Sequence, residues 1–183
     1  MIRPSRVAHL AARFFASLHP RPLDAPTLAW VTGVLAPGEL HVWEGLGAAD
    51  RAESVAVARR VEAALEASDA SDPAWIAAAL LHDVGKQASA YGPFGRAVAT
   101  LVTGVAGADA VRAWAEEPSR VKGRLGRYAA HDEVGGDLLR LAGARAEAAA
   151  WADAHHRPDH WDSTGIPPGV CRALARADGE ALP

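Results

Sequence analysis

The chain has 183 residues, half of them hydrophobic but only 6% aromatic, and a formal net charge of -3. This length fits a single domain, and a composition rich in alanine and poor in aromatic residues favours helices over strands. Basic and acidic residues are interspersed, so the sequence carries no electrostatic footprint for nucleic acid or for an anionic membrane.

The first part of the chain is predicted to form three helices. An amphipathic helix over residues 5–17 carries an apolar stripe and is expected to dock on the rest of the protein. After a proline-rich connector, we expect a helix over residues 24–35 and a short one over residues 39–45. We therefore divide the chain into an N-terminal helical extension, residues 1–45, and a main domain, residues 46–183.

Two further helices follow in the main domain. The first, over residues 50–68, has Asp50 as its expected cap and Glu53 in capping-box register. The second, over residues 73–83, is strongly apolar and is expected to stop at Gly85. Its last turn nevertheless carries a histidine and an aspartate.

The remainder of the chain also follows helical periodicity, with no strand-like alternation competing with it. The tryptophans on the apolar faces are expected to anchor the core; these are Trp30, Trp75, Trp114 and Trp151. The sequence thus predicts an all-α, single-domain helical bundle. The later helices are expected over residues 93–102, 108–114, 119–128, 132–141, 145–154 and 168–178.

The lone Cys171 excludes an intramolecular disulfide and a thiolate cluster, so a metal site in this chain must use nitrogen and oxygen ligands. No run of about 18 uncharged apolar residues occurs, the length that a membrane-spanning helix requires. We expect a cytoplasmic protein, and the sequence leaves its oligomeric state open.

Histidine and aspartate recur at the ends of the predicted helices. Such groups are costly beside an apolar core unless something neutralises and orients them, and a divalent cation does both. His9, His19, His41 and His160 lie outside this pattern and are expected to be surface or packing residues. The residues of the pattern are His82, Asp83, His131, His155, His156 and Asp178.

This ordered set resembles the HD-domain superfamily of metal-dependent phosphohydrolases. His82 and Asp83, within His-Asp-Val-Gly-Lys, match the doublet for which the superfamily is named, and Asp178 matches its late aspartate. His131, with His155 or His156, matches the extra ligands of members that bind two or more metals. The stretch from His155 to Pro167 is also similar to the HD-GYP subgroup.

The chain departs from these patterns at particular positions. In the HD-GYP-like stretch, Arg157 replaces a glutamate and Ile166 replaces a tyrosine. At the upstream position where the superfamily has a ligand histidine, this chain has Glu53. A glutamate can also ligate such metals, so Glu53 is either a metal ligand or only the capping-box partner of Asp50.

The resemblance implies a phosphohydrolase with two divalent transition metal ions, drawn from manganese, iron, cobalt, nickel and zinc, and with Asp83 bridging them. The substrate is expected to be a nucleotide or another small phosphorylated compound. Lys86 would reach a phosphate oxygen, and His131 or His156 would protonate the leaving group. Trp161 lies beside this site in sequence and is a weaker candidate for stacking on a base.

Two alternatives stay open. Because Glu53 replaces the histidine, the chain can instead be a catalytically degenerate HD domain that binds a nucleotide or a protein partner as a regulatory module. It can also be a helical scaffold whose histidines carry no chemistry. The second alternative predicts that replacing His82 and Asp83 leaves the stability and the response to chelators unchanged.

Overall fold

The computed structural model describes residues 22–67, 72–89, 91 and 93–179. The prediction of an all-helical fold is confirmed, since these residues form α-helices and two 3-10 turns and contain no strand. The expected helix over residues 5–17 lies outside the described residues. The elements are α2 (Ala25–Val34), α3 (Pro37–Glu44), α4 (Ala48–Glu66), α5 (Pro73–Leu81), η1 (Val84–Ser89), α6 (Pro93–Ala106), α7 (Ala108–Arg112), α8 (Arg120–Ala129), α9 (His131–Leu141), α10 (Ala146–Ala154), η2 (Pro158–Ser163) and α11 (Pro168–Asp178).

Helix α5 lies at the centre of the main core. Every residue from Ile76 to Leu81 is buried, because α5 packs against α4 and α10 and also contacts α2, α3 and α11. Helix α4 begins at Ala48, after Gly47, which provides no side-chain cap. The predicted cap at Asp50 is therefore wrong, because Asp50 already lies in the first turn of the helix.

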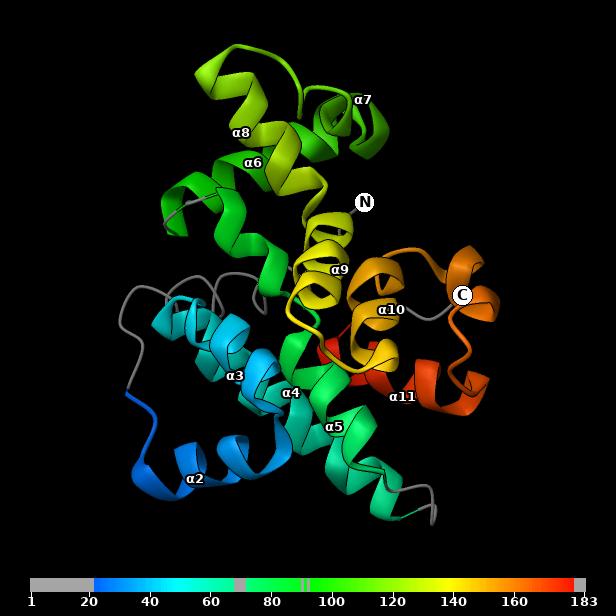
Figure 1. The fold of residues 1–183 in the computed structure, drawn as a ribbon. Helices are drawn as coiled ribbons and strands as arrows, with labels where there is room; N and C mark the ends of the chain where they lie inside the picture. Colours follow the sequence, from blue (N-terminus) through cyan, green and yellow to red (C-terminus); the bar gives the residue numbers. More distant parts are fainter. Residues whose placement is uncertain (1–21, 68–71, 90, 92, 180–183) are drawn as a thin grey trace, which may run out of the picture.

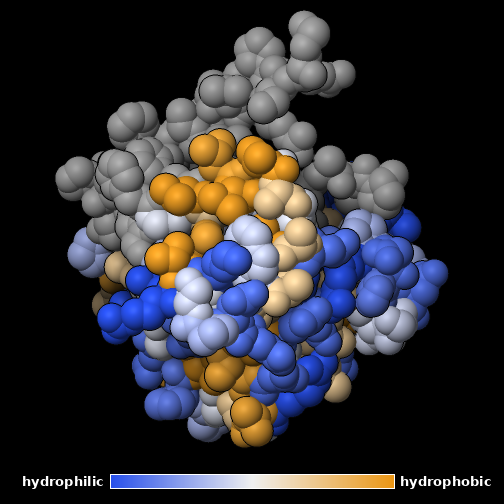
Figure 2. Space-filling model, turned by 90° about the horizontal axis from the view of Figure 1, so that it is seen from above, coloured by the Kyte–Doolittle hydropathy of each residue, from blue (hydrophilic) through white to orange (hydrophobic). Residues whose placement is uncertain are grey.

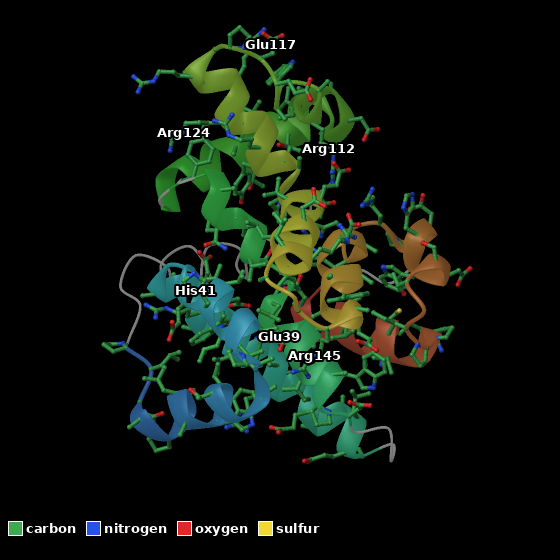
Figure 3. The ribbon with its side chains drawn as sticks, viewed as in Figure 1. Glu39, His41, Arg112, Glu117, Arg124 and Arg145 are labelled. Atoms are coloured by element: carbon green, nitrogen blue, oxygen red, sulfur yellow. The ribbon has the colours of Figure 1, made fainter. Side chains whose placement is uncertain are left out.

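The described part of the N-terminal extension packs on this same core. Val31 and Trp43 are fully or almost fully buried in it. Glu39 is also buried, and its carboxylate accepts hydrogen bonds from the Arg145 backbone and guanidinium at 2.8–2.9 Å. Figure 3 shows Glu39 and Arg145 next to each other, at the junction of α3 with the start of α10. The ion pair thus ties α3 to the start of α10.

Gly85 is not the helix stop that the sequence suggested, because it lies inside η1. A Cβ atom there would collide with the backbone carbonyl oxygen of His131. The glycine therefore allows η1 and the first turn of α9 to approach backbone to backbone. This close contact brings the end of α5 next to the start of α9.

Helices α6, α7 and α8 form a second, smaller cluster beyond α9, at the top of Figure 1. Its buried residues are Ala99, Val111 and Leu125, with the rings of Tyr91, Trp114 and Tyr128 packed against them. Ser119 caps α8 by accepting a hydrogen bond from the Lys122 backbone. Across the described ranges, no helix combines the length and the apolar character needed to cross a bilayer.

Candidate metal centre

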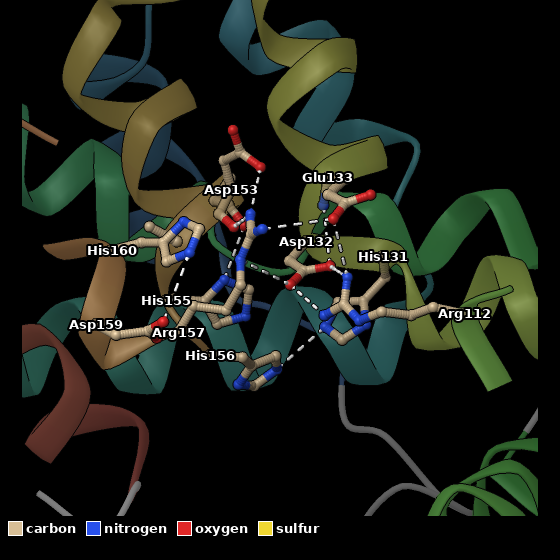
Figure 4. Close-up of polar contacts among 12 residues, drawn as sticks. Arg112, His131, Asp132, Glu133, Asp153, His155, His156, Arg157, Asp159 and His160 are labelled. Carbon is tan, nitrogen blue, oxygen red and sulfur yellow. Dashed lines mark hydrogen bonds and ion pairs between the residues drawn. The ribbon is translucent and has the colours of Figure 1, made fainter. Parts of the chain in front are cut away.

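Four of the predicted ligands meet where α5, α9 and α10 come together. Asp83 follows α5, His131 opens α9, and His155 and His156 follow α10. One ligand atom from each of these residues lies within 4.8 Å of the others. Asp83, His131 and His155 are buried, whereas His156 is exposed, and Figure 4 shows the three histidines facing one another. The sequence left His155 and His156 as alternatives, and the structure brings both to the centre.

The buried histidines share one backbone arrangement. In each, Nδ1 lies within hydrogen-bonding distance of the carbonyl oxygen three residues earlier, so Nδ1 must donate because a carbonyl only accepts. Nε2 is thereby left to bind a metal, the arrangement usual for ligating histidines. The pairs are His82 with Ala79 at 2.9 Å, His131 with Tyr128 at 2.8 Å and His155 with Ala152 at 2.8 Å.

The carboxylate of Asp83 lies between the imidazoles of His131 and His155 on one side and the imidazole of His82 on the other. Its Oδ1 is 3.4 Å from His131 Nε2 and 3.8 Å from His155 Nε2. Its Oδ2 is 3.3 Å from His82 Nε2, which is in turn 3.5 Å from Asp178 Oδ1. Two ligands held about 2.1 Å from one ion in tetrahedral geometry lie about 3.4 Å apart. The observed separations fit that spacing.

Several of these atoms are buried without a hydrogen bond. His82 Nε2, Asp83 Oδ1 and His155 Nε2 find no hydrogen-bond partner among the described residues. Leaving such groups unsatisfied is costly, and their presence in a native structure often marks an ion or a catalytic role. The donor set, imidazole nitrogen with carboxylate oxygen, suits a divalent transition metal. The residues present therefore fit a metal ion.

Burial keeps His131 and His155, the two histidines that face Asp83 Oδ1, in the neutral form that ligates a metal. It lowers the pKa of His155 to about 3. Burial, together with the positive charge of Lys86, also lowers the pKa of His131. Both imidazoles are thus ready to ligate without losing a proton at neutral pH.

On the Oδ2 side of Asp83, neighbouring charges determine which groups are protonated. Burial opposes protonation of His82, but the carboxylates of Asp83 and Asp178 raise its pKa well above the usual value. Burial alone would raise the pKa of Asp83, yet the charges of Lys86 and His82 hold it well below its usual value. Without a metal, His82 is therefore a cation between two carboxylates, and it would have to give up its Nε2 proton to ligate an ion there.

Lys86 also contacts this carboxylate directly. Its ammonium group donates to Asp83 Oδ2, and the side chain is 18% exposed. Although burial opposes it, the charge of Asp83 raises the pKa of Lys86. Lys86 is thus held as a cation at the edge of the centre, as its position after the doublet suggested.

Glu53 is not part of the group of four. It lies in α4, its side chain is 31% exposed, and Arg60 Nη2 is 3.9 Å from its carboxylate. The capping-box interpretation is wrong because α4 starts two residues before Asp50. Ligation by Glu53 stays a prediction.

A charged network that the sequence did not reveal surrounds the two helices that carry the histidines. Arg112 of α7 makes a two-pronged contact with Asp132, at 2.9 and 2.6 Å, and Asp132 is fully buried. Arg157 Nε lies 3.8 Å from the same carboxylate, and its Nη2 donates to Asp153 Oδ1 at 2.9 Å. Figure 4 shows the two arginines reaching Asp132 from opposite sides. Because Asp132 follows His131 and Arg157 follows His156, this network links the two ligand-bearing segments.

Trp161 and His160, which the sequence placed near the site as weaker candidates, lie outside the group of four. Trp161 is 9% exposed, and its indole nitrogen donates to the Ala154 carbonyl at 3.1 Å, so it packs in the core beside Trp151. The His160 side chain is 49% exposed and pairs with Asp159, as expected for a surface residue.

Comparison with models of known protein families, with curated proteins and with solved structures finds no match for this chain. The relation to the HD-domain superfamily therefore stays a prediction from the residues. The convergence of Asp83 with three histidines is a property of the structure itself.

Proposed function

We propose that this protein is a metal-dependent phosphohydrolase that acts on a nucleotide or another small phosphate ester. The position of Asp83 carries the proposal, because its two carboxylate oxygens face different sets of imidazoles. A carboxylate shared in this way is typical of two-metal hydrolytic sites. The ordered residues that resemble an HD domain add support.

The ligands divide into two groups around the shared aspartate. His82 and Asp178 would hold one ion with Asp83, and His131 and His155 would hold the other. Three protein ligands per ion leave a coordination position for water or substrate, as in catalytic sites generally. Bound divalent ions would supply a polarised water and positive charge for the phosphate.

Lys86 and His156 are assigned to the substrate. Lys86 is protonated and partly exposed next to Asp83, so it can bind a phosphate oxygen as a point charge. His156 is the exposed member of the group, and its Nε2 is 3.2 Å from His131 Nε2. Being on the solvent side, His156 can give a proton to the leaving alkoxide.

The test combines metal analysis with phosphate release. Purified protein should contain bound metal, and chelator-stripped protein should recover phosphate release on a panel of nucleotides when manganese or iron is added. His155→Gln should lose metal and activity, whereas His160→Gln, an exposed loop histidine, should keep both. Stripped protein whose stability and activity do not respond to added metal would overturn the proposal.

The position of Glu53 favours a second candidate, a regulatory domain that binds a nucleotide without hydrolysing it. Glu53 contacts Arg60 and stands outside the group of four. In this case the protein binds a nucleotide tightly, forms no product, and stays inactive in the Glu53→His variant. Turnover by the unaltered protein excludes this candidate.

A further inference from the structure

A groove of about 690 Å³ lies between the start of α6 and helix α8. Its volume falls within the range of ligand pockets for small molecules. The walls combine apolar and basic side chains, with Val98 and Val121 both more than half exposed. Figure 2 views the molecule from the α7–α8 end and shows hydrophobic surface directly beside hydrophilic surface.

Two arginines give the groove its charge. Arg120 and Arg124 both line it, and a spacing of four residues places them on one face of α8. The guanidinium of Arg124 lies over the Tyr91 ring, 4.4 Å from its centroid. Figure 3 shows Arg124 on the α6 side of α8. Paired guanidinium groups one turn apart suit a phosphate group, because each presents several N–H donors to its oxygens.

The groove also offers a planar surface beside apolar side chains. Tyr91 packs directly on the α6 backbone, where Gly95 has no Cβ atom to collide with its ring. Because the Arg124 guanidinium covers the Tyr91 ring, the surface suited to a heteroaromatic base is the guanidinium plane of Arg124 beside the two valines. Bases stack favourably on aromatic rings and on arginine planes without requiring a particular sequence.

A chain of ring contacts connects this groove to the metal centre. Tyr91 makes an edge-to-face contact with Tyr128 at 5.8 Å, and Tyr128 is 5.9 Å from the His131 ring. The backbone carbonyl of Tyr128 also accepts the His131 Nδ1 hydrogen bond. Arg124 and Tyr128 are one turn apart in α8, about 6 Å along the helix axis. These two ring contacts place the Tyr91 side of the groove within about 12 Å of the His131 ring.

We propose that this groove binds the base and the non-reacting phosphate of a nucleotide that carries two separate phosphate groups. The reacting phosphate then lies at the metal centre, next to Lys86 and His156. This inference rests on the proposed phosphohydrolase function. It assigns specificity to Arg120, Arg124 and Tyr91, none of which belongs to the metal centre.

The experiment measures binding as well as turnover. Adenosine 3′,5′-bisphosphate and adenosine 5′-monophosphate are titrated into metal-loaded protein by calorimetry. We expect the bisphosphate to bind about tenfold more tightly, from its additional charge-assisted hydrogen bonds. Arg120→Gln and Arg124→Gln should each remove this advantage. Arg172→Gln, the same charge change on an exposed arginine of α11, should leave it intact.

Equal affinities for the two nucleotides, or equal effects of the groove and control variants, would overturn the assignment of the groove. If the protein hydrolyses the bisphosphate and its KM is unchanged in both groove variants, the proposed function stands and the assignment of the groove is wrong. Arginine-dependent binding supports the groove, and if the metal-loaded protein also releases no phosphate from any nucleotide of the panel, the hydrolase is refuted.

Discussion

The buried pair of Arg112 and Asp132 offers a sharp test of how the centre is held together. We consider Arg112→Met, which keeps much of the side-chain volume but removes the guanidinium. Asp132 is fully buried, and the variant leaves its carboxylate the Glu133 backbone N–H at 3.0 Å and, as a cationic partner, the more distant Arg157, with Nε at 3.8 Å. Breaking a buried ion pair by removing one partner costs about 3–5 kcal/mol. Because Arg157 compensates in part, we expect about 3 kcal/mol.

That loss should be visible in both stability and metal binding. For a chain of this length, about 3 kcal/mol corresponds to a melting temperature lower by about 6–12 °C. Because Asp132 follows His131 and orients the start of α9, metal affinity should also fall, by about 10-fold to 100-fold. Scanning calorimetry of metal-free protein and competition with a chromophoric chelator measure the two effects separately.

Arg145→Met is the matched control. It breaks another buried pair, with Glu39, at the end of α10 opposite His155. The control should lose stability and retain its metal affinity. If Arg112→Met loses stability with unchanged metal affinity, the network is structural only; if neither changes, the argument from the buried charge is refuted.

Three other measurements follow from the geometry. Manganese at 100 times its dissociation constant should stabilise chelator-stripped protein by about 2.7 kcal/mol, and His155→Gln but not His160→Gln should abolish this in a thermal melt. Gly85→Ala should lower the free energy of unfolding by about 1–3 kcal/mol, because its methyl group would collide with the backbone of α9. Gly104→Ala is the control, because a Cβ atom at that position meets nothing within 4 Å. Denaturant unfolding compares the stabilities of the two variants. Burial would raise the pKa of Asp132, but Arg112 lowers it below 3.8. The ionised Asp132 carboxylate therefore stabilises the fold fully above pH 3.8, and this contribution is lost as the pH falls through the lowered pKa of Asp132. In metal-free protein, the difference in unfolding free energy between the unaltered protein and Asp132→Asn should shrink over that acidic range. A difference that does not change with pH would refute this reasoning.

The sequence by itself determined the helices and several of their ends. Asp24 and Ser119 each accept a hydrogen bond from the backbone of the first turn, as expected of caps. These features were predictable because hydrophobic periodicity and capping depend on residues only a few positions apart. For the same reason the candidate ligands could be placed at helix ends, since His82 caps the end of α5 and His155 that of α10.

Only the tertiary structure decided which of these residues meet. It brought His155 and His156 together with Asp83 and His131, and it left Glu53 beside Arg60. Arg112 pairs with Asp132 across 20 positions of the chain, a contact for which no local pattern exists. Such contacts depend on how the helices pack, which is set by the whole set of buried surfaces and not by any single segment.

The roles of one glycine and one tryptophan depended on packing in the same way. Gly85 suggested a helix stop but serves the approach of α9, whereas Trp161, only a weaker candidate for stacking on a base, is buried against Trp151. In both cases the local chemistry of the residue was interpreted correctly, while its neighbours in space were unknown. The sequence thus determined the helices and the ligand types, and the packing of α5, α9 and α10 decided the centre that they form.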